Sequence, residues 1–143
     1  MTRIDFHVNA PDKLAHGCRL LRKVVRAGQR AVVIGPPALI ADLDEALWTF
    51  SPLDFLPHVA ASDPLAGNTP ILLCTEAVET PHQEVLVNLG HDTPAFFGRF
   101  ERLIEVVARE DADRAAARNR WRFYKERGYP MSSFDLSGAE AGE

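Results

Sequence analysis

The sequence has little cysteine and no long apolar run. Cys18 and Cys74 are the only cysteines among its 143 residues, and both lie within apolar stretches. Because neither has a second Cys or a His at metal-ligand spacing, we predict buried, reduced thiols rather than disulfides or a metal site. The first ten residues, MTRIDFHVNA, contain no apolar signal-peptide core, and no run of 18 apolar residues occurs. These features indicate a soluble, cytoplasmic protein without a membrane segment.

The sequence also lacks the glycine-rich loops and nucleophile motifs of common enzymes. The turns after the first two expected strands read NAPDK and GPPALI, so the first has no glycine and the second has two prolines without an N–H donor. Neither matches a dinucleotide-binding loop or a P-loop, and no G-x-S-x-G motif occurs. The five histidines are scattered, and Asp42 and Asp44 lie on the solvent side of an expected helix. We therefore predict no catalytic residue and no cofactor, which favours a binding protein over an enzyme.

Hydrophobic periodicity predicts an α/β fold. Residues 3–8 alternate between apolar and polar, and residues 30–35 form a continuous apolar run, as in strands that are buried on one or both faces. After each of them, at residues 13–27 and 38–48, apolar side chains recur at helical spacing. This strand–helix–strand–helix order is typical of a parallel sheet.

The second half of the chain continues with shorter elements. Residues 49–70 are rich in turn formers and predict a loop with a short extended piece near 55–58. Residues 93–100 predict a short helix or turn over the sheet edge, and a last helix follows at 110–128 with acidic residues in its first turn and basic residues in its last. We expect the remaining strands at 71–75, 84–90 and 102–108, and we expect the strand at 102–108 to be the last strand in the chain.

Together these elements predict a single α/β domain over residues 1–136, with a mostly parallel central sheet and helices on both faces. The content of 46% hydrophobic and 25% charged residues suits one globular domain of this length. The small and polar stretch SGAEAGE at 137–143 predicts a flexible C-terminal tail.

Positive charge is concentrated near the end of the chain. The segment Arg114–Arg127 contains six basic residues and one acidic residue, a net charge of +5, whereas the whole chain has −4 and the remainder therefore −9. We predict that any anionic partner meets this segment. On an ideal helix, an arc of about 100° contains Arg114, Arg118, Trp121, Arg122 and Lys125. We expect Phe123, Ala116 and Ala117 to point away from this arc, toward the sheet.

This arc has three interpretations. The simplest is a solvated charged face on which arginine stems half cover Trp121. A second is a dock for an acidic peptide, because arginine binds carboxylates with two hydrogen bonds and a tryptophan supplies an apolar wall for an anchoring side chain. A third is single-stranded nucleic acid, which uses a similar mixture of side chains, but the acidic remainder of the chain disfavours it.

A second distinctive stretch is LDEALWTFSPLDFLPH at residues 43–58. It leaves a helix, enters a proline-rich loop and concentrates the apolar side chains Trp48, Phe50, Leu53, Phe55 and Leu56. Such a loop either covers the core or forms an exposed apolar patch for a partner protein.

Two of these motifs carry a family resemblance. The motif LDEALW followed by FLPH, and the C-terminal run EVVAREDADRAAARNRWRFYKERGY, resemble the chi subunit family of bacterial DNA polymerase III, in the same order and over nearly the whole chain. The resemblance implies one α/β domain that is similar to nucleotide-binding folds but has no nucleotide site. It also implies an adaptor rather than a catalyst, monomeric by itself and heterodimeric with the psi subunit of the clamp-loader complex. The other implied partner is the acidic C-terminal tail of single-stranded-DNA-binding protein, so that contact with DNA would be only indirect.

The resemblance also implies which residues bind these partners. For the tail of the single-stranded-DNA-binding protein they are Arg114, Arg118, Trp121, Arg122 and Lys125, with Val107 and Gly128 nearby. For the psi subunit they are Trp48, Phe55, Pro57 and His58. The alternatives are a small α/β enzyme that binds a nucleotide or another small molecule, and a protein that binds single-stranded DNA directly through the basic helix.

Overall fold

The computed structural model describes residues 1–49 and 55–137. Phe50, Leu53 and most of the predicted tail lie outside these ranges. Within them the chain forms seven strands and three α-helices: β1 (Arg3–Ala10), α1 (Lys13–Arg26), β2 (Ala31–Ile34), α2 (Pro37–Thr49), β3 (His58–Ala60), β4 (Ile71–Cys74), β5 (Val85–Asn88), β6 (Arg102–Ala108), α3 (Asp111–Glu126) and β7 (Met131–Asp135). Two short 3-10 turns, η1 and η2, span Ala66–Asn68 and Phe97–Arg99.

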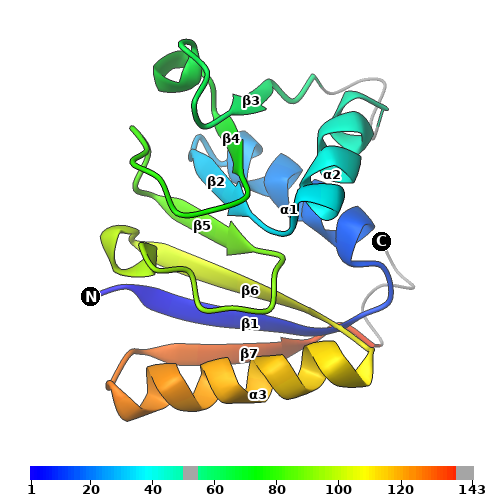
Figure 1. Ribbon diagram of the computed structural model, residues 1–143, viewed down its shortest axis with the longest axis vertical. Coiled ribbons are helices and arrows are strands. Elements are labelled where there is room, and N and C mark those ends of the chain that lie inside the picture. The colour runs from blue at the N-terminus through cyan, green and yellow to red at the C-terminus, as the bar shows by residue number, and fades with distance from the viewer. Residues whose placement is uncertain (50–54, 138–143) are drawn as a thin grey trace.

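The strands form one sheet in the order β3-β4-β2-β5-β6-β1-β7 (Figure 1). Every neighbouring pair is parallel, which confirms the predicted α/β class with a parallel sheet. The connections from β1 to β2 and from β2 to β3 step toward one edge of the sheet, whereas the connection from β6 to β7 steps toward the other. Because crossovers of this kind are right-handed, α1 and α2 lie on one face and α3 on the opposite face.

The core therefore has two layers, one on each face of the sheet. Between the sheet and helices α1 and α2 lie Cys18, Leu21, Leu43, Val33, Leu73, Val87 and Ile104, all buried. The layer on the α3 face contains Ile4, Phe6, Leu72, Leu103, Ala117 and Tyr124. Strands β2, β4 and β5 are covered on both faces, which explains why AVVI, ILLC and the first three residues of VLVN are apolar.

Three predictions about the elements require correction. The strand at 102–108 is not the last one, because β7 follows α3 and pairs with β1. Its sequence MSSFD is mostly exposed and polar, so no apolar pattern marks it. The extended piece expected near 55–58 is β3, which begins only at His58. The turn η2 does not cover a sheet edge but packs on the α3 face, since Phe96 and Phe97 belong to that core layer.

Both cysteines are free and buried, as the sequence predicted. Burial raises the pKa of the Cys18 thiol and of the Cys74 thiol to about 11, so neither is ionised near neutral pH. None of the helices in the described ranges combines the length and the apolar character that crossing a membrane requires.

Candidate protein-docking sites

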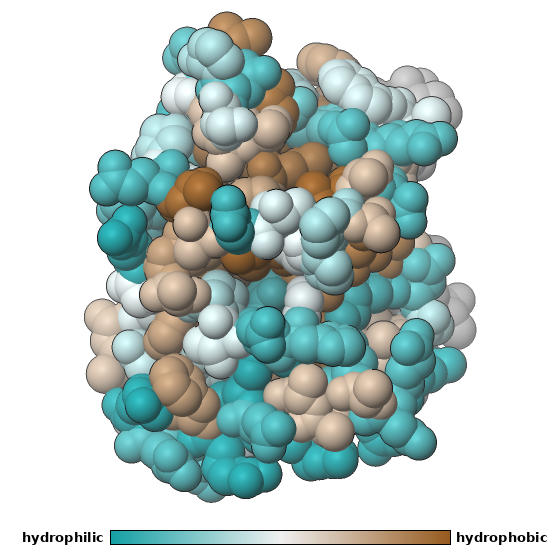
Figure 2. Space-filling view, in the orientation of Figure 1, coloured by the Kyte–Doolittle hydropathy of each residue, from teal (hydrophilic) through white to brown (hydrophobic). Residues whose placement is uncertain are grey.

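Helix α3 packs on the sheet through one stripe of side chains. Asp113, Ala117, Arg120 and Tyr124 are its buried residues, at spacings of three or four. Glu110 precedes its first turn, and the acidic residues of that turn suit the positive end of the helix dipole. The predicted docking residues Arg114, Arg118, Arg122 and Lys125 are exposed on the other side. In Figure 2 hydrophilic residues predominate at the end of the molecule where α3 lies.

A buried polar network fixes how α3 is rotated about its axis. The carboxylate of Glu105 in β6 accepts hydrogen bonds from the Tyr124 hydroxyl at 2.6 Å and the Asn88 amide at 2.8 Å. Nε of Arg120 lies 3.1 Å from the same carboxylate, and its Nη1 donates to the His91 carbonyl. Burial raises the pKa of Glu105, and the Arg120 charge opposes this rise. Arg120 and Tyr124 are thus core residues, although in the sequence they lie within the basic segment.

A small pocket of about 300 Å³ lies between α3, β1 and β6. Val107, Phe6 and Val8 come from the strands, and Ala117 and Trp121 come from the helix. The Trp121 ring meets the Phe6 ring edge to face, with 5.1 Å between the ring centroids. The pocket is also lined by Asn9, Arg114 and Arg118. An apolar hollow thus lies beside two exposed guanidinium groups.

The structure brings together four of the seven residues that the family resemblance implies for tail binding, namely Val107, Arg114, Arg118 and Trp121. Arg122, Lys125 and Gly128 are exposed on or just after the same helix but do not line the pocket. Sequence reasoning missed the contribution of β1. The alternation of residues 3–8 places Phe6 and Val8 on one face of a strand, but it does not say which helix covers that face.

Aromatic side chains form a patch at the far end of the sheet, next to β3. Trp48 in the last turn of α2 is 55% exposed and Phe55 is 72% exposed, with their ring centroids 5.8 Å apart. The ring of His58 lies 4.2 Å from that of Trp48. Pro57 is half-buried beside them. The residues predicted for psi binding are therefore close together in space.

His58 differs from its neighbours because its side chain is buried. Its Nδ1 lies 2.7 Å from the Leu56 carbonyl, and its Nε2 lies 3.0 Å from the Asp44 carbonyl and 3.2 Å from the Asp44 carboxylate. These oxygens hold the imidazole in place under Trp48. His58 therefore supports the exposed tryptophan more than it offers a surface of its own.

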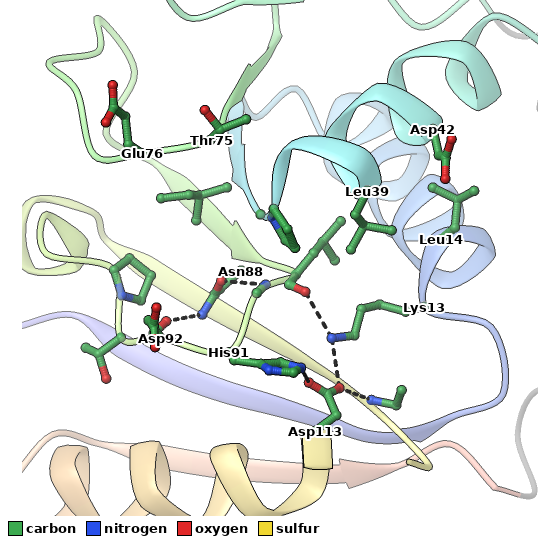
Figure 3. Close-up of a pocket in the computed structure, with 18 of the residues that line it drawn as sticks. Lys13, Leu14, Leu39, Asp42, Thr75, Glu76, Asn88, His91, Asp92 and Asp113 are labelled. Carbon is green, nitrogen blue, oxygen red and sulfur yellow. Dashed lines mark hydrogen bonds and ion pairs between the residues drawn. The ribbon is translucent and has the colours of Figure 1, made fainter. Parts of the chain in front are cut away.

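A hollow of about 910 Å³ lies at the carboxyl ends of the strands (Figure 3). This is where parallel α/β sheets bind phosphate groups. Here the carboxylate of Asp113 accepts a hydrogen bond from the backbone N–H of Ala108 at 2.6 Å. Nζ of Lys13 and Nε2 of His91 each lie 2.8 Å from the same carboxylate. Further carboxylates line the hollow, from Asp12, Asp42, Glu76, Asp92 and Glu110. This lining would repel a phosphate, which argues against the nucleotide alternative.

Within residues 1–49 and 55–137, no three metal-ligating side chains lie close enough together to hold an ion.

Comparison with known proteins identifies the family. The family described as DNA polymerase III chi subunit, HolC, matches residues 1–132. DNA polymerase III subunit chi of Pseudomonas aeruginosa is 35% identical over 141 residues, which cover 95% of this chain and 98% of that protein. The subunits chi of Haemophilus influenzae and Escherichia coli are 26% and 25% identical over 118 residues, 81% of this chain and 82% and 80% of theirs. These matches extend over nearly the whole sheet and all three helices, and they show that the chain belongs to the DNA polymerase III chi subunit family.

Proposed function

We propose that the chain is a non-catalytic adaptor in DNA replication. In this proposal it joins the clamp loader of DNA polymerase III through the psi subunit, and it binds the acidic C-terminal tail of single-stranded-DNA-binding protein. Membership of the chi family supports an accessory role in replication. The observation that carries the finer proposal is the pocket between α3, β1 and β6, with two arginines beside an apolar floor.

The chemistry of this pocket suits a peptide end that combines carboxylates with an apolar side chain. Arg114 and Arg118 can each bind a carboxylate with two charge-assisted hydrogen bonds. Trp121, Phe6 and Val107 form the apolar surface on which an aromatic anchor would pack. Arg122 and Lys125, farther along α3, would meet further acidic residues of the tail. We expect an affinity in the micromolar range, because a short peptide makes few contacts and loses entropy when it is ordered.

Substitution of Arg118 tests the tail site. We expect Arg118→Ala to weaken binding of a synthetic acidic peptide that ends in Pro-Phe by at least about tenfold, or about 1.4 kcal/mol, because a charge-assisted hydrogen bond is lost. Isothermal titration calorimetry measures the dissociation constant. The matched control is Arg127→Ala, because this side chain lies over the Phe123 ring at 3.7 Å and does not line the pocket. An unchanged dissociation constant for Arg118→Ala would contradict the site.

The aromatic patch supports the psi half of the proposal. Large aromatic side chains with more than half of their surface exposed are typical of protein interfaces, and Trp48 and Phe55 are neighbours of this kind. A stable complex through this patch would leave the α3 pocket accessible, since the two lie near opposite edges of the sheet (Figure 1).

A further inference from the structure

Asn9 lines the α3 pocket with a backbone conformation that residues other than glycine seldom adopt. Its φ is +61°, and every other residue with a positive φ in the ranges 1–49 and 55–137 is a glycine. Asn9 lies in a β-bulge, because the register of β1 against β6 shifts between His7 and Ala10 and leaves one extra residue in β1. Left-handed residues of this kind store strain, and they are concentrated at ligand-binding and catalytic sites.

Strand β7 holds the Asn9 side chain. The Asn9 amide donates to one carboxylate oxygen of Asp135 at 3.1 Å, and the hydroxyl and backbone N–H of Ser137 donate to the same oxygen at 2.7 Å and 2.9 Å. These hydrogen bonds, first those from Ser137 and then that from Asn9, lower the pKa of Asp135 to about 2. Because β6, β1 and β7 lie side by side next to α3 (Figure 1), the exposed strand β7 supports one end of the pocket.

The backbone carbonyl of Asn9 binds an arginine that the family resemblance does not include. Nε of Arg109, which lies between β6 and α3, donates to this carbonyl at 3.3 Å. Arg109 is exposed, and its Nη1 and Nη2 make no hydrogen bond or ion pair with another described residue. Asp135 feels the Arg109 charge but forms no ion pair with it and already accepts three hydrogen bonds. A neutral carbonyl thus holds the guanidinium group and leaves its charge uncompensated.

Positive charge at the α3 pocket is therefore available to a ligand from two sides. The side chains of Arg114 and Arg118 line the pocket from the helix, and they also lack a hydrogen bond or ion pair within the part of the chain that the structure describes. Arg109 lies next to Asn9, which lines the pocket from the sheet. Since one hydrogen bond already holds Arg109, this side chain loses less conformational entropy when it binds a carboxylate.

We propose that Arg109 is a further carboxylate-binding residue of the α3 pocket and that Asn9 is the positioning residue that holds it there. This inference rests on the proposed binding of an acidic tail. The apolar anchor of the tail packs on Trp121, the arginines of α3 bind carboxylates on the helix side of the anchor, and Arg109 binds one on the sheet side. A residue that cannot keep a positive φ at position 9 moves the carbonyl and releases the guanidinium group.

Isothermal titration calorimetry with the synthetic acidic peptide that ends in Pro-Phe tests the role of Arg109. We expect Arg109→Ala to raise the dissociation constant at least about fivefold, because a charge-assisted hydrogen bond is lost. Two analogues of the peptide identify the carboxylate, one with asparagine in place of its aspartates and one with a C-terminal amide. With one of them the effect of Arg109→Ala should shrink below about twofold. The matched control is Arg99→Ala, which removes an exposed arginine outside the pocket and should change the dissociation constant less than about twofold.

Substitutions of Asn9 test its positioning role with the same peptide. Asn9→Gly keeps access to a positive φ and should leave the dissociation constant within about twofold of the wild-type value. Asn9→Val introduces a β-branched residue that disfavours this φ and should raise the dissociation constant at least about fivefold. Addition of Arg109→Ala to Asn9→Val should then cost less than about twofold more, because the guanidinium group is no longer held. Circular dichroism shows that each variant is folded, and Asn9→Ala replaces Asn9→Val if the valine prevents folding.

The remaining outcomes separate this inference from the proposed function. If Arg118→Ala weakens peptide binding and Arg109→Ala does not, the tail site stands and the role of Arg109 is wrong. No binding to the wild-type chain at about 1 mM peptide would overturn both. Equal losses in Arg109→Ala and Arg99→Ala would replace a specific contact by general electrostatic attraction. Equal affinities of Asn9→Gly and Asn9→Val would show that Asn9 does not position Arg109.

Discussion

Arg118 and Arg120 lie two positions apart in α3 and have opposite environments. Two residues span about 200° of a helix, so one side chain faces solvent while the other faces the sheet. Arg118 lines the pocket proposed for the acidic tail, whereas Arg120 is buried against Glu105. The sequence pattern placed both in one basic segment. Only the position of Glu105 on β6 shows which arginine neutralises a buried carboxylate and which remains accessible to a partner.

At the same scale, the surroundings of His7 predict how the stability of the fold depends on pH. Its Nδ1 lies 2.9 Å from Nε2 of His16, and burial, His16 and Arg102 lower the pKa of His7 from 6.5 to about 4. Because the pKa in the folded chain is below that in the unfolded chain, the unfolded chain binds more protons between these two values. The free energy of unfolding therefore falls as the pH falls from 6.5 to about 4.

Urea unfolding of the wild-type chain and of His7→Gln between about pH 4 and pH 7 measures this effect. The stability of the variant should fall less steeply with decreasing pH, because glutamine does not titrate. Identical pH profiles for the two proteins would mean that His7 does not contribute to the acid sensitivity of the fold.

At the scale of elements, the buried contacts of α3 determine what the helix presents to solvent. Tyr124 and Arg120 of α3 both bind Glu105, so the helix cannot rotate without taking two partners away from a buried carboxylate. This arrangement keeps Arg118 and Trp121 beside the pocket. The stability of the network and the affinity of the proposed tail site are therefore linked through the orientation of one helix.

Removal of the Tyr124 hydroxyl tests this role. We expect Tyr124→Phe to reduce the free energy of unfolding by about 1.5–3 kcal/mol, because a hydrogen bond to a buried charge is lost. Chemical denaturation provides the measurement. Tyr129→Phe is the control, because this half-buried tyrosine contacts Phe97 and Tyr124 through its ring, and it should cost less than about 0.5 kcal/mol. Equal stability of Tyr124→Phe and the wild-type chain would contradict an anchoring role.

At the scale of the whole molecule, the order of strands separates the two proposed partners. Strand β3, beside the aromatic patch, and β1, beside the α3 pocket, are five strand spacings apart, or about 24 Å. Residues at such a distance with no shared contacts contribute independently to stability and binding. The arrangement suits a protein that holds one partner firmly and another weakly at the same time.

Substitution of Trp48 tests this separation. We expect Trp48→Ala to abolish co-purification with the psi subunit while circular dichroism and binding of the acidic peptide remain unchanged, because the side chain is largely exposed. The matched control is Leu65→Ala, which removes another exposed apolar side chain outside the patch. If Trp48→Ala unfolds the chain or weakens peptide binding as much as psi binding, the two surfaces are not independent.

The sequence by itself determined the α/β class, the three helices and the buried strands, because apolar runs such as AVVI and the helical spacing in α1 are local consequences of burial. Its motifs also led to the chi family. It did not determine β7, whose exposed sequence MSSFD forms a strand only because β1 has an unpaired edge to bind it. The tertiary structure alone decided that Phe6, Val107 and Trp121 meet in one pocket. The physical reason is that these contacts join residues far apart in the chain. The strand order brings them together, and hydrophobic periodicity in the sequence does not indicate strand order.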